Sequence, residues 1–295
     1  VTDTGTATTD SITFNDTDSD DVDIFDGEAV TITGFETATI NFTNTTDSTH
    51  SAAQSIGAVT MAADTGGTTT LNLNGNRAIT SGVITANTID ASGMTAAFSN
   101  TGAAMVGTTS GTNTLTGGSG DDVLVGDAND TTNITGGAGD DNITGGTDAE
   151  TIAGGAGADT IAGGGGADTI TGGAGNDVIT LGGATESVDA GAGDDTVNAA
   201  ANLAFGTTIV GGAGTDILDV EDAEVIGDAS VVSGFETLVI DGNLSIDLDT
   251  YSNNTFTKVV LDDSNYGTIS SVRNETIELT KVVGGTGTIE MEDAT

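Results

Sequence analysis

The chain has no cysteine and no proline, and it has only four Lys and Arg residues and one His in 295 residues. Without cysteine it can form neither disulfides nor thiolate metal sites. Against these few cations stand 45 Asp and Glu residues, which give a formal net charge of −41 at pH 7. Such a surface repels nucleic acids and anionic membranes and attracts divalent cations. We therefore expect a metal ion as partner, with no nucleic-acid partner and no membrane insertion.

Aromatic residues and long apolar runs are also scarce. Phe, Trp and Tyr make up 3% of the chain, and no apolar run approaches the roughly 18 residues of a membrane-spanning helix. Strongly charged chains with few aromatics often stay disordered, because they cannot bury enough apolar area. Here 36% of the residues are hydrophobic, and Ile, Val and Leu recur at a regular spacing. This pattern favours an ordered fold that depends on neutralisation of the acidic charge.

The middle of the chain repeats a nine-residue unit, G-G-x-G-x-D-x-U-x, in which U is a large aliphatic residue. Successive U positions are nine residues apart except for one step of ten, and a further copy, GGAGTDILD, follows at 211–219 after an interruption. Units this short and this rich in glycine exclude helix pairs and predict a solenoid in which each repeat is one strand and one turn. The U side chains, which we expect to point inward, are Leu115, Leu124, Ile134, Ile143, Ile152, Ile161, Ile170, Ile179, Val188 and Val197.

Two such repeats complete one turn of a flattened right-handed coil, so each repeat stacks on the one two places along, at about 4.8 Å. The three residues at positions seven to nine form the strand. Asp159 and Asp177, 18 residues apart, would then lie on the same edge and repel each other in a partly dry loop. Calcium between the rungs reverses that repulsion, because it takes six to eight oxygen ligands from carboxylates and turn carbonyls. Oxygen-only ligands also favour calcium over zinc.

The register resembles the repeats-in-toxin (RTX) calcium-binding nonapeptides over residues 108–219. The resemblance implies an all-β fold with a parallel β-roll in the middle and several bound Ca²⁺ ions. It also implies a secreted protein, extracellular or at the cell surface, exported by type I secretion from a Gram-negative bacterium. In this family the Asp at the sixth position binds calcium, which carries over to Asp122, Asp141, Asp159, Asp168, Asp177, Asp195 and Asp216.

The two edges of the predicted roll are not equal. The first edge offers an Asp at every sixth position. The second edge has a Thr, at 131 or 132, followed by Glu, Asp and Glu, and the fourth-position glycine is replaced by Asp148 and Thr185. We expect about four strong calcium sites on the first edge and one to three weaker ones on the second. The first edge carries Asp122, Asp141, Asp159, Asp177 and Asp195, and the second carries Glu150, Asp168 and Glu186.

Residues 1–107 and 220–295 form β-rich flanks on either side of the roll, because short alternating runs such as VTITGFETATINF and ETIELT are broken by turn residues. The phrase GFET occurs at 34–37 and again at 234–237, at an offset of 200. Either the N-terminal flank is duplicated, or one phrase is reused where a solenoid changes its cross-section. The segment NTIDASGMTAAFSN, followed by a calcium roll, also resembles bacterial surface-layer proteins that carry such repeats.

No catalytic constellation accompanies the repeats. His50 is the only histidine, and neither H-E-x-x-H nor G-x-S-x-G occurs. Asp16, Asp18 and Asp20 have EF-hand spacing, but Asp21 stands where that loop needs glycine. We therefore expect no enzyme.

The expected function is that of an extracellular, calcium-dependent structural protein, a subunit or fragment of a surface layer or fibre that self-associates. The alternatives are the stalk of a secreted adhesin and the export and folding module of a larger secreted enzyme or toxin. Because the chain begins with Val1, we expect it to be a piece of something longer.

Overall fold

The computed structural model describes residues 10–16, 29–42, 54–62, 67–100, 111–182, 185–199, 206–221, 232–241, 246–247, 256–261, 268–272, 276–279 and 288–291. Asp18, Asp20 and His50 lie outside these ranges. The chain divides into two compact units, residues 1–156 and 157–295. Every regular element in the described ranges is a strand, and no helix there could cross a membrane.

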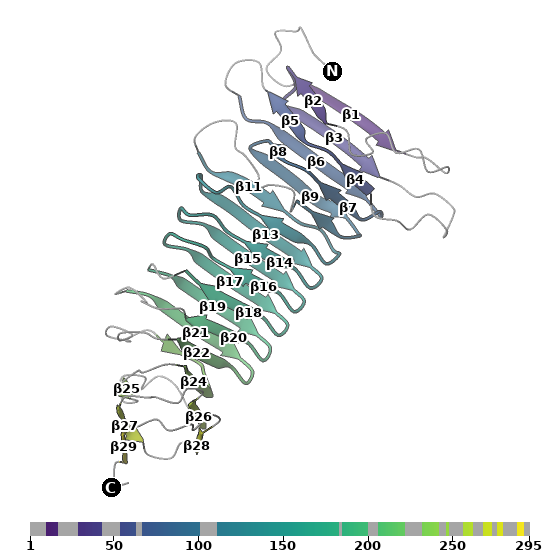
Figure 1. Cartoon of the computed structure of the whole chain (residues 1–295). Coiled ribbons are helices and arrows are strands. Elements are labelled where there is room, and N and C mark those ends of the chain that lie inside the picture. Colours follow the sequence, from purple (N-terminus) through teal and green to yellow (C-terminus); the bar gives the residue numbers. More distant parts are fainter. Residues whose placement is uncertain are drawn as a thin grey trace. The chain divides into compact units, whose positions relative to one another are not determined.

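The strands of the first unit form three parallel sheets (Figure 1). Within each sheet, every strand pairs with the strand of the next turn of the coil, and each such turn is called a rung. The orders are β1-β3-β6-β9-β11-β13-β15, β4-β7-β10-β12-β14 and β2-β5-β8. The strands are β1 (Ser11–Asp16), β2 (Val30–Thr33), β3 (Thr37–Phe42), β4 (Gln54–Ile56), β5 (Val59–Ala62), β6 (Thr70–Gly75), β7 (Ile79–Ser81), β8 (Ile84–Thr85), β9 (Thr88–Met94), β10 (Phe98–Ser99), β11 (Asn113–Thr116), β12 (Val123–Val125), β13 (Thr132–Ala138), β14 (Asn142–Thr144) and β15 (Thr151–Ala156).

The second unit repeats this parallel architecture. Its sheets have the orders β17-β19-β21-β23, β16-β18-β20-β22-β24-β26-β28 and β25-β27-β29. The strands are β16 (Thr160–Ala162), β17 (Thr169–Ala174), β18 (Val178–Leu181), β19 (Ser187–Ala192), β20 (Thr196–Ala199), β21 (Thr208–Ala213), β22 (Ile217–Glu221), β23 (Val232–Ser233), β24 (Thr237–Asp241), β25 (Ile246–Asp247), β26 (Lys258–Leu261), β27 (Thr268–Val272), β28 (Thr276–Leu279) and β29 (Thr288–Met291).

These sheets confirm the all-β, parallel β-solenoid prediction and the strands expected in the flanks. They also confirm that each repeat stacks on the one two places along, because Ile161 pairs with Ile179 and Ile170 with Val188. The ten predicted inward side chains form the core, and none is more than 2% exposed. The three-segment division of the chain at residues 107 and 219 stays a prediction.

Strand length differs between the two main sheets of the second unit. In β16 the strand covers only the three residues predicted from the repeat, whereas β17 and β19 continue through the glycines that follow. Gly173 pairs with Gly191 across this extension, and their φ angles are 126° and 113°. Such φ values are open to glycine and strained for other residues. The turn glycines therefore belong to the backbone ladder itself.

Replacement of Gly191 by Ala is expected to destabilise the protein by more than about 2 kcal/mol. The new Cβ would be forced to a positive φ and would meet the carbonyl oxygen of Gly173 on the neighbouring rung. Urea unfolding in saturating calcium measures the effect. Gly111 is the matched control, because a Cβ added there has no heavy atom within 4 Å. A midpoint for Gly191→Ala equal to that of Gly111→Ala would contradict the proposed role of the glycine ladder.

Candidate metal centre

Each acid of the first edge precedes a strand, and the carboxylates of four of them accept a hydrogen bond from the rung before: Asp122, Asp141, Asp177 and Asp195. In the second unit, the backbone N–H of Asp159 donates to Oδ1 of Asp177 at 2.8 Å. Asp177 donates to Asp195 at 2.8 Å, and Asp195 donates to Asp216 at 2.9 Å. In the first unit, the N–H of Asp122 donates to Oδ1 of Asp141 at 2.8 Å. Sequence reasoning placed these acids on one edge but missed the backbone amide as the partner of one oxygen.

All nine sixth-position acids predicted from the sequence are buried, and none is more than 2% exposed. The pKa of Asp177 is raised to about 6, chiefly by burial and also by the neighbouring charges of Asp159 and Asp195, although the N–H of Asp159 lowers it. Burial is also the main cause of the raised pKa values of Asp195 and Asp216. The nine acids are Asp122, Asp141, Glu150, Asp159, Asp168, Asp177, Glu186, Asp195 and Asp216.

The second carboxylate oxygen sets Asp177, Asp195 and Asp216 apart from Asp122. In Asp122, Oδ1 and Oδ2 accept hydrogen bonds from the N–H groups of Phe98 and Gly118, each at 2.6 Å. In Asp177, Asp195 and Asp216, Oδ2 is buried and has no hydrogen-bond partner. A buried anionic oxygen without a partner is costly. A cation that prefers oxygen ligands would remove that cost, so these residues fit calcium.

Backbone carbonyls lie beside these carboxylates. At Gly172, the first glycine of its repeat, an added Cβ would fall within 3.0 Å of both Asp177 Oδ2 and the carbonyl oxygen of Ala190, on the next rung. Within the described ranges, no three carboxylate or imidazole side chains gather so that they could hold a metal ion. The carbonyls would therefore have to complete the coordination shell. The same pairing of Oδ2 with a next-rung carbonyl occurs at Gly117 and Gly136.

The second edge is built with longer hydrogen bonds. Oε2 of Glu150 accepts from Gly146 of its own turn at 3.2 Å, and Oε2 of Glu186 accepts from the N–H of Asp168 at 3.2 Å. The sequence left it undecided whether residue 131 or 132 occupies the sixth position of one second-edge repeat. Asn133 pairs with Thr151, the residue that follows Glu150, so the sixth position is Thr132. The weaker calcium sites expected on this edge stay a prediction. The number of bound ions stays a prediction.

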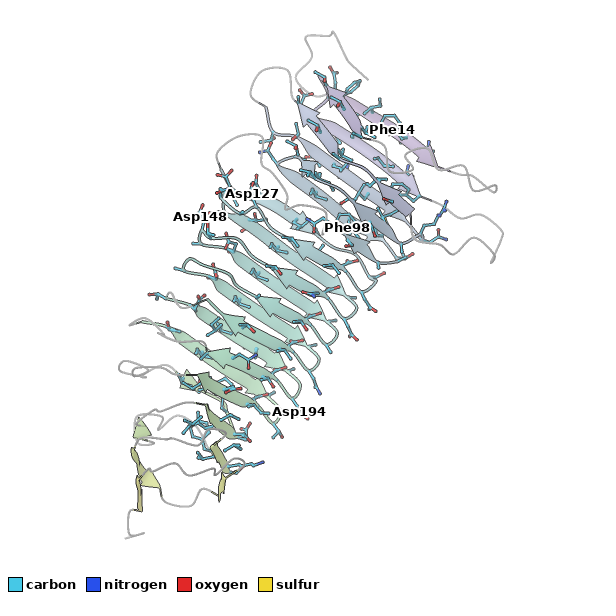
Figure 2. The ribbon with its side chains drawn as sticks, in the orientation of Figure 1. Phe14, Phe98, Asp127, Asp148 and Asp194 are labelled. Atoms are coloured by element: carbon cyan, nitrogen blue, oxygen red, sulfur yellow. The ribbon has the colours of Figure 1, made fainter. Side chains whose placement is uncertain are left out.

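Loop composition also changes on the second edge (Figure 2). Asp127 and Asp148 replace turn glycines there; Asp127 is 5% exposed and Asp148 is exposed. Oδ1 of Asp127 accepts from the N–H of Asn129 at 3.0 Å, a side-chain turn that substitutes for glycine geometry. The fifth-position Asp194, by contrast, lies exposed at the loop margin of the first edge, and its Oδ1 accepts from the N–H of Thr215 at 2.9 Å.

Two further acids join the hydrogen-bonding pattern, and sequence reasoning missed both. Oε2 of Glu36 accepts from the N–H of Asp10 at 2.8 Å, and Oε2 of Glu236 accepts from the N–H of Asp216 at 2.8 Å. Each is the Glu of a GFET phrase. The repetition of GFET was the only sign in the sequence that these two Glu residues have a common role. Because GFET does not follow the nine-residue spacing, the sequence could not assign either Glu to an edge of the roll.

Comparison with known families supports the interpretation of the repeats. The family model of the RTX calcium-binding nonapeptide repeat (4 copies) matches residues 108–131, 129–161, 144–179 and 162–197. No curated protein and no solved structure matches the chain. The matched residues contain all the acids predicted as metal ligands except Asp216.

Proposed function

Because this chain is an RTX calcium-binding β-roll protein, we propose that it is an extracellular structural protein, a subunit or fragment of a surface layer or fibre, whose folding and assembly require calcium. RTX repeats are typical of secreted proteins, and the proposed location is the cell exterior or cell surface, reached by type I secretion. The proposal includes no catalytic activity.

The stacked carboxylates of the first edge carry this proposal. Asp177, Asp195 and Asp216 are each buried. In each, one carboxylate oxygen accepts a hydrogen bond from the backbone N–H of the acid on the preceding rung, and the second oxygen is buried without a hydrogen bond. Without a cation, ionised carboxylates one rung apart oppose the stacking that the strands require. With calcium, the same oxygens hold successive rungs together. We therefore propose that metal binding is the step that folds the chain into the solenoid.

The place of β1 at the edge of its sheet, among the strands that the structure describes, supports the assembly part of the proposal. In the first unit, β1 is the last strand of its sheet. An edge strand offers backbone N–H and C=O groups that can pair with another chain. Pairing of this edge with a strand of another copy would give a route to self-association, and repetition of that contact would give a fibre or a sheet.

Electron microscopy of the chain with calcium, with EGTA and with magnesium tests this function. We expect ordered sheets or fibres in calcium only, because magnesium is smaller and loses its bound water reluctantly. Isolated rods in calcium would favour an adhesin stalk. Folded single particles that never associate would favour an export and folding module of a larger protein. Either result would remove the lattice or fibre from the proposal.

A further inference from the structure

The two GFET phrases form the same local structure. Gly34 and Gly234 have φ angles of 82° and 80°. The Glu two residues later accepts, in both places, a hydrogen bond of 2.8 Å from the backbone N–H of an Asp on the preceding rung. The strands then align in the same register, because Ser11 pairs with Thr37 and Ile217 pairs with Thr237. Both a duplication and a reused phrase predict this likeness.

In the second unit, the GFET turn takes the place of a nonapeptide turn. Within the repeats, the N–H of Asp195 donates to Asp216, and the strand that follows Asp216 is β22. One rung later, the N–H of Asp216 donates to Glu236, and the strand that follows Glu236 is β24. Glu236 therefore stands where a sixth-position Asp would stand. Because Glu has one more methylene than Asp, a turn shorter than that of a nonapeptide can still bring its carboxylate to the backbone N–H of the acid on the preceding rung.

Asp216 carries the features that mark the calcium-type positions inside the repeats. Its side chain is 0% exposed, and its Oδ2 is buried without a hydrogen-bond partner. An added Cβ at Gly211 would fall within 3.0 Å of both Asp216 Oδ2 and the carbonyl oxygen of Gly234. At Gly172 the corresponding atoms are Asp177 Oδ2 and the Ala190 carbonyl. The first glycine of GFET thus supplies the carbonyl that the next nonapeptide supplies elsewhere.

We propose that the GFET turn, which is no nonapeptide, closes a calcium site at Asp216 by supplying the Gly234 carbonyl oxygen, beyond the matched repeats that end at residue 197. The proposal rests on the proposed function, since it assumes that the first edge binds calcium. Asp216 Oδ2 and the Gly234 carbonyl oxygen are the ligands from this chain. Glu236 is a positioning residue, because it holds the backbone of Asp216 through its N–H. The metal ladder accordingly extends one rung into the C-terminal flank.

Calcium stoichiometry of the full chain, measured by isothermal titration calorimetry, tests the additional site. Asp216→Asn keeps the size of the side chain and an oxygen acceptor for Asp195, and it is expected to bind one ion fewer than the unchanged protein. Glu236→Ala removes the acceptor of the Asp216 N–H, and it is expected to weaken binding of one ion about tenfold and to leave the others unchanged. Asp189→Asn is the matched control, because Asp189 lies exposed on β19 and its loss also removes one negative charge.

The possible outcomes separate this inference from the proposed function. If the unchanged protein binds calcium and Asp216→Asn binds the same number of ions as Asp189→Asn, the additional site does not exist and the proposed function stands. If the unchanged protein binds no calcium, both fail. If Asp216→Asn does not regain β-type circular dichroism in saturating calcium, the Glu236→Ala titration decides, and an unchanged isotherm overturns the proposal.

Discussion

In excess EGTA at pH 7, the chain is expected to lose its β-type far-ultraviolet circular dichroism and to recover it when calcium is added back. At free calcium near 100 times the dissociation constant, each independent site contributes about 2.7 kcal/mol of stability. Four sites would contribute about 11 kcal/mol, which is comparable to the whole stability of an ordinary domain, roughly 5–15 kcal/mol. Removal of the metal should therefore unfold the repeats and not merely loosen them.

The charge distribution around the first edge explains why the metal-free chain should not stay wound. Asp177 lies between Asp159 and Asp195, whose charges both raise its pKa, and the net charge of the chain is −41. Magnesium in place of calcium is the control, because it matches the ionic charge without matching the ligand number. An EGTA spectrum that equals the calcium spectrum would show that the rungs stack without metal, and the coupling of binding to folding would be lost.

In the calcium-free protein, mild acid is expected to restore part of the β-type signal that calcium removal abolishes. The pKa of Asp177 is raised from 3.8 to about 6 in the folded state. The folded state therefore binds protons more tightly than the unfolded state, and the stability of the metal-free fold rises as the pH falls from about 6 toward 3.8. Asp122, Asp195 and Asp216 have pKa values raised in the same direction, chiefly by burial, and add to the effect.

Circular dichroism between pH 7 and pH 5 of protein dialysed free of both calcium and EGTA tests this prediction while staying above the isoelectric point near 4.1. The control is concentrated NaCl at pH 7, which screens exposed charges but screens buried ones much less. Recovery in acid but not in salt places the opposing charge on the buried first edge. Recovery in salt at pH 7 would instead assign it to the exposed surface. A signal that does not change in acid would contradict the role of the buried carboxylates.

The sequence alone was sufficient to predict the solenoid and the interior of the repeats. Ile161, Ile179 and Val197 recur at equal spacing, and the nearby glycines exclude a helix, so only a short strand and turn can repeat with this period. The same spacing placed Asp177 and Asp195 on one edge. These features are local or strictly periodic, and a periodic chain leaves few ways to stack its repeats.

Tertiary structure decided what each carboxylate contacts. One oxygen of Asp177 accepts a hydrogen bond from the amide of Asp159, while the other is buried without a hydrogen bond. This arrangement depends on the side-chain rotamer and on the offset between rungs, which the sequence spacing of the acids does not encode. Structure also decided that Glu236 continues the first edge. Its turn is shorter than a nonapeptide, so the period ends before it. Only the pairing of β22 with β24 brings Glu236 to the amide of Asp216.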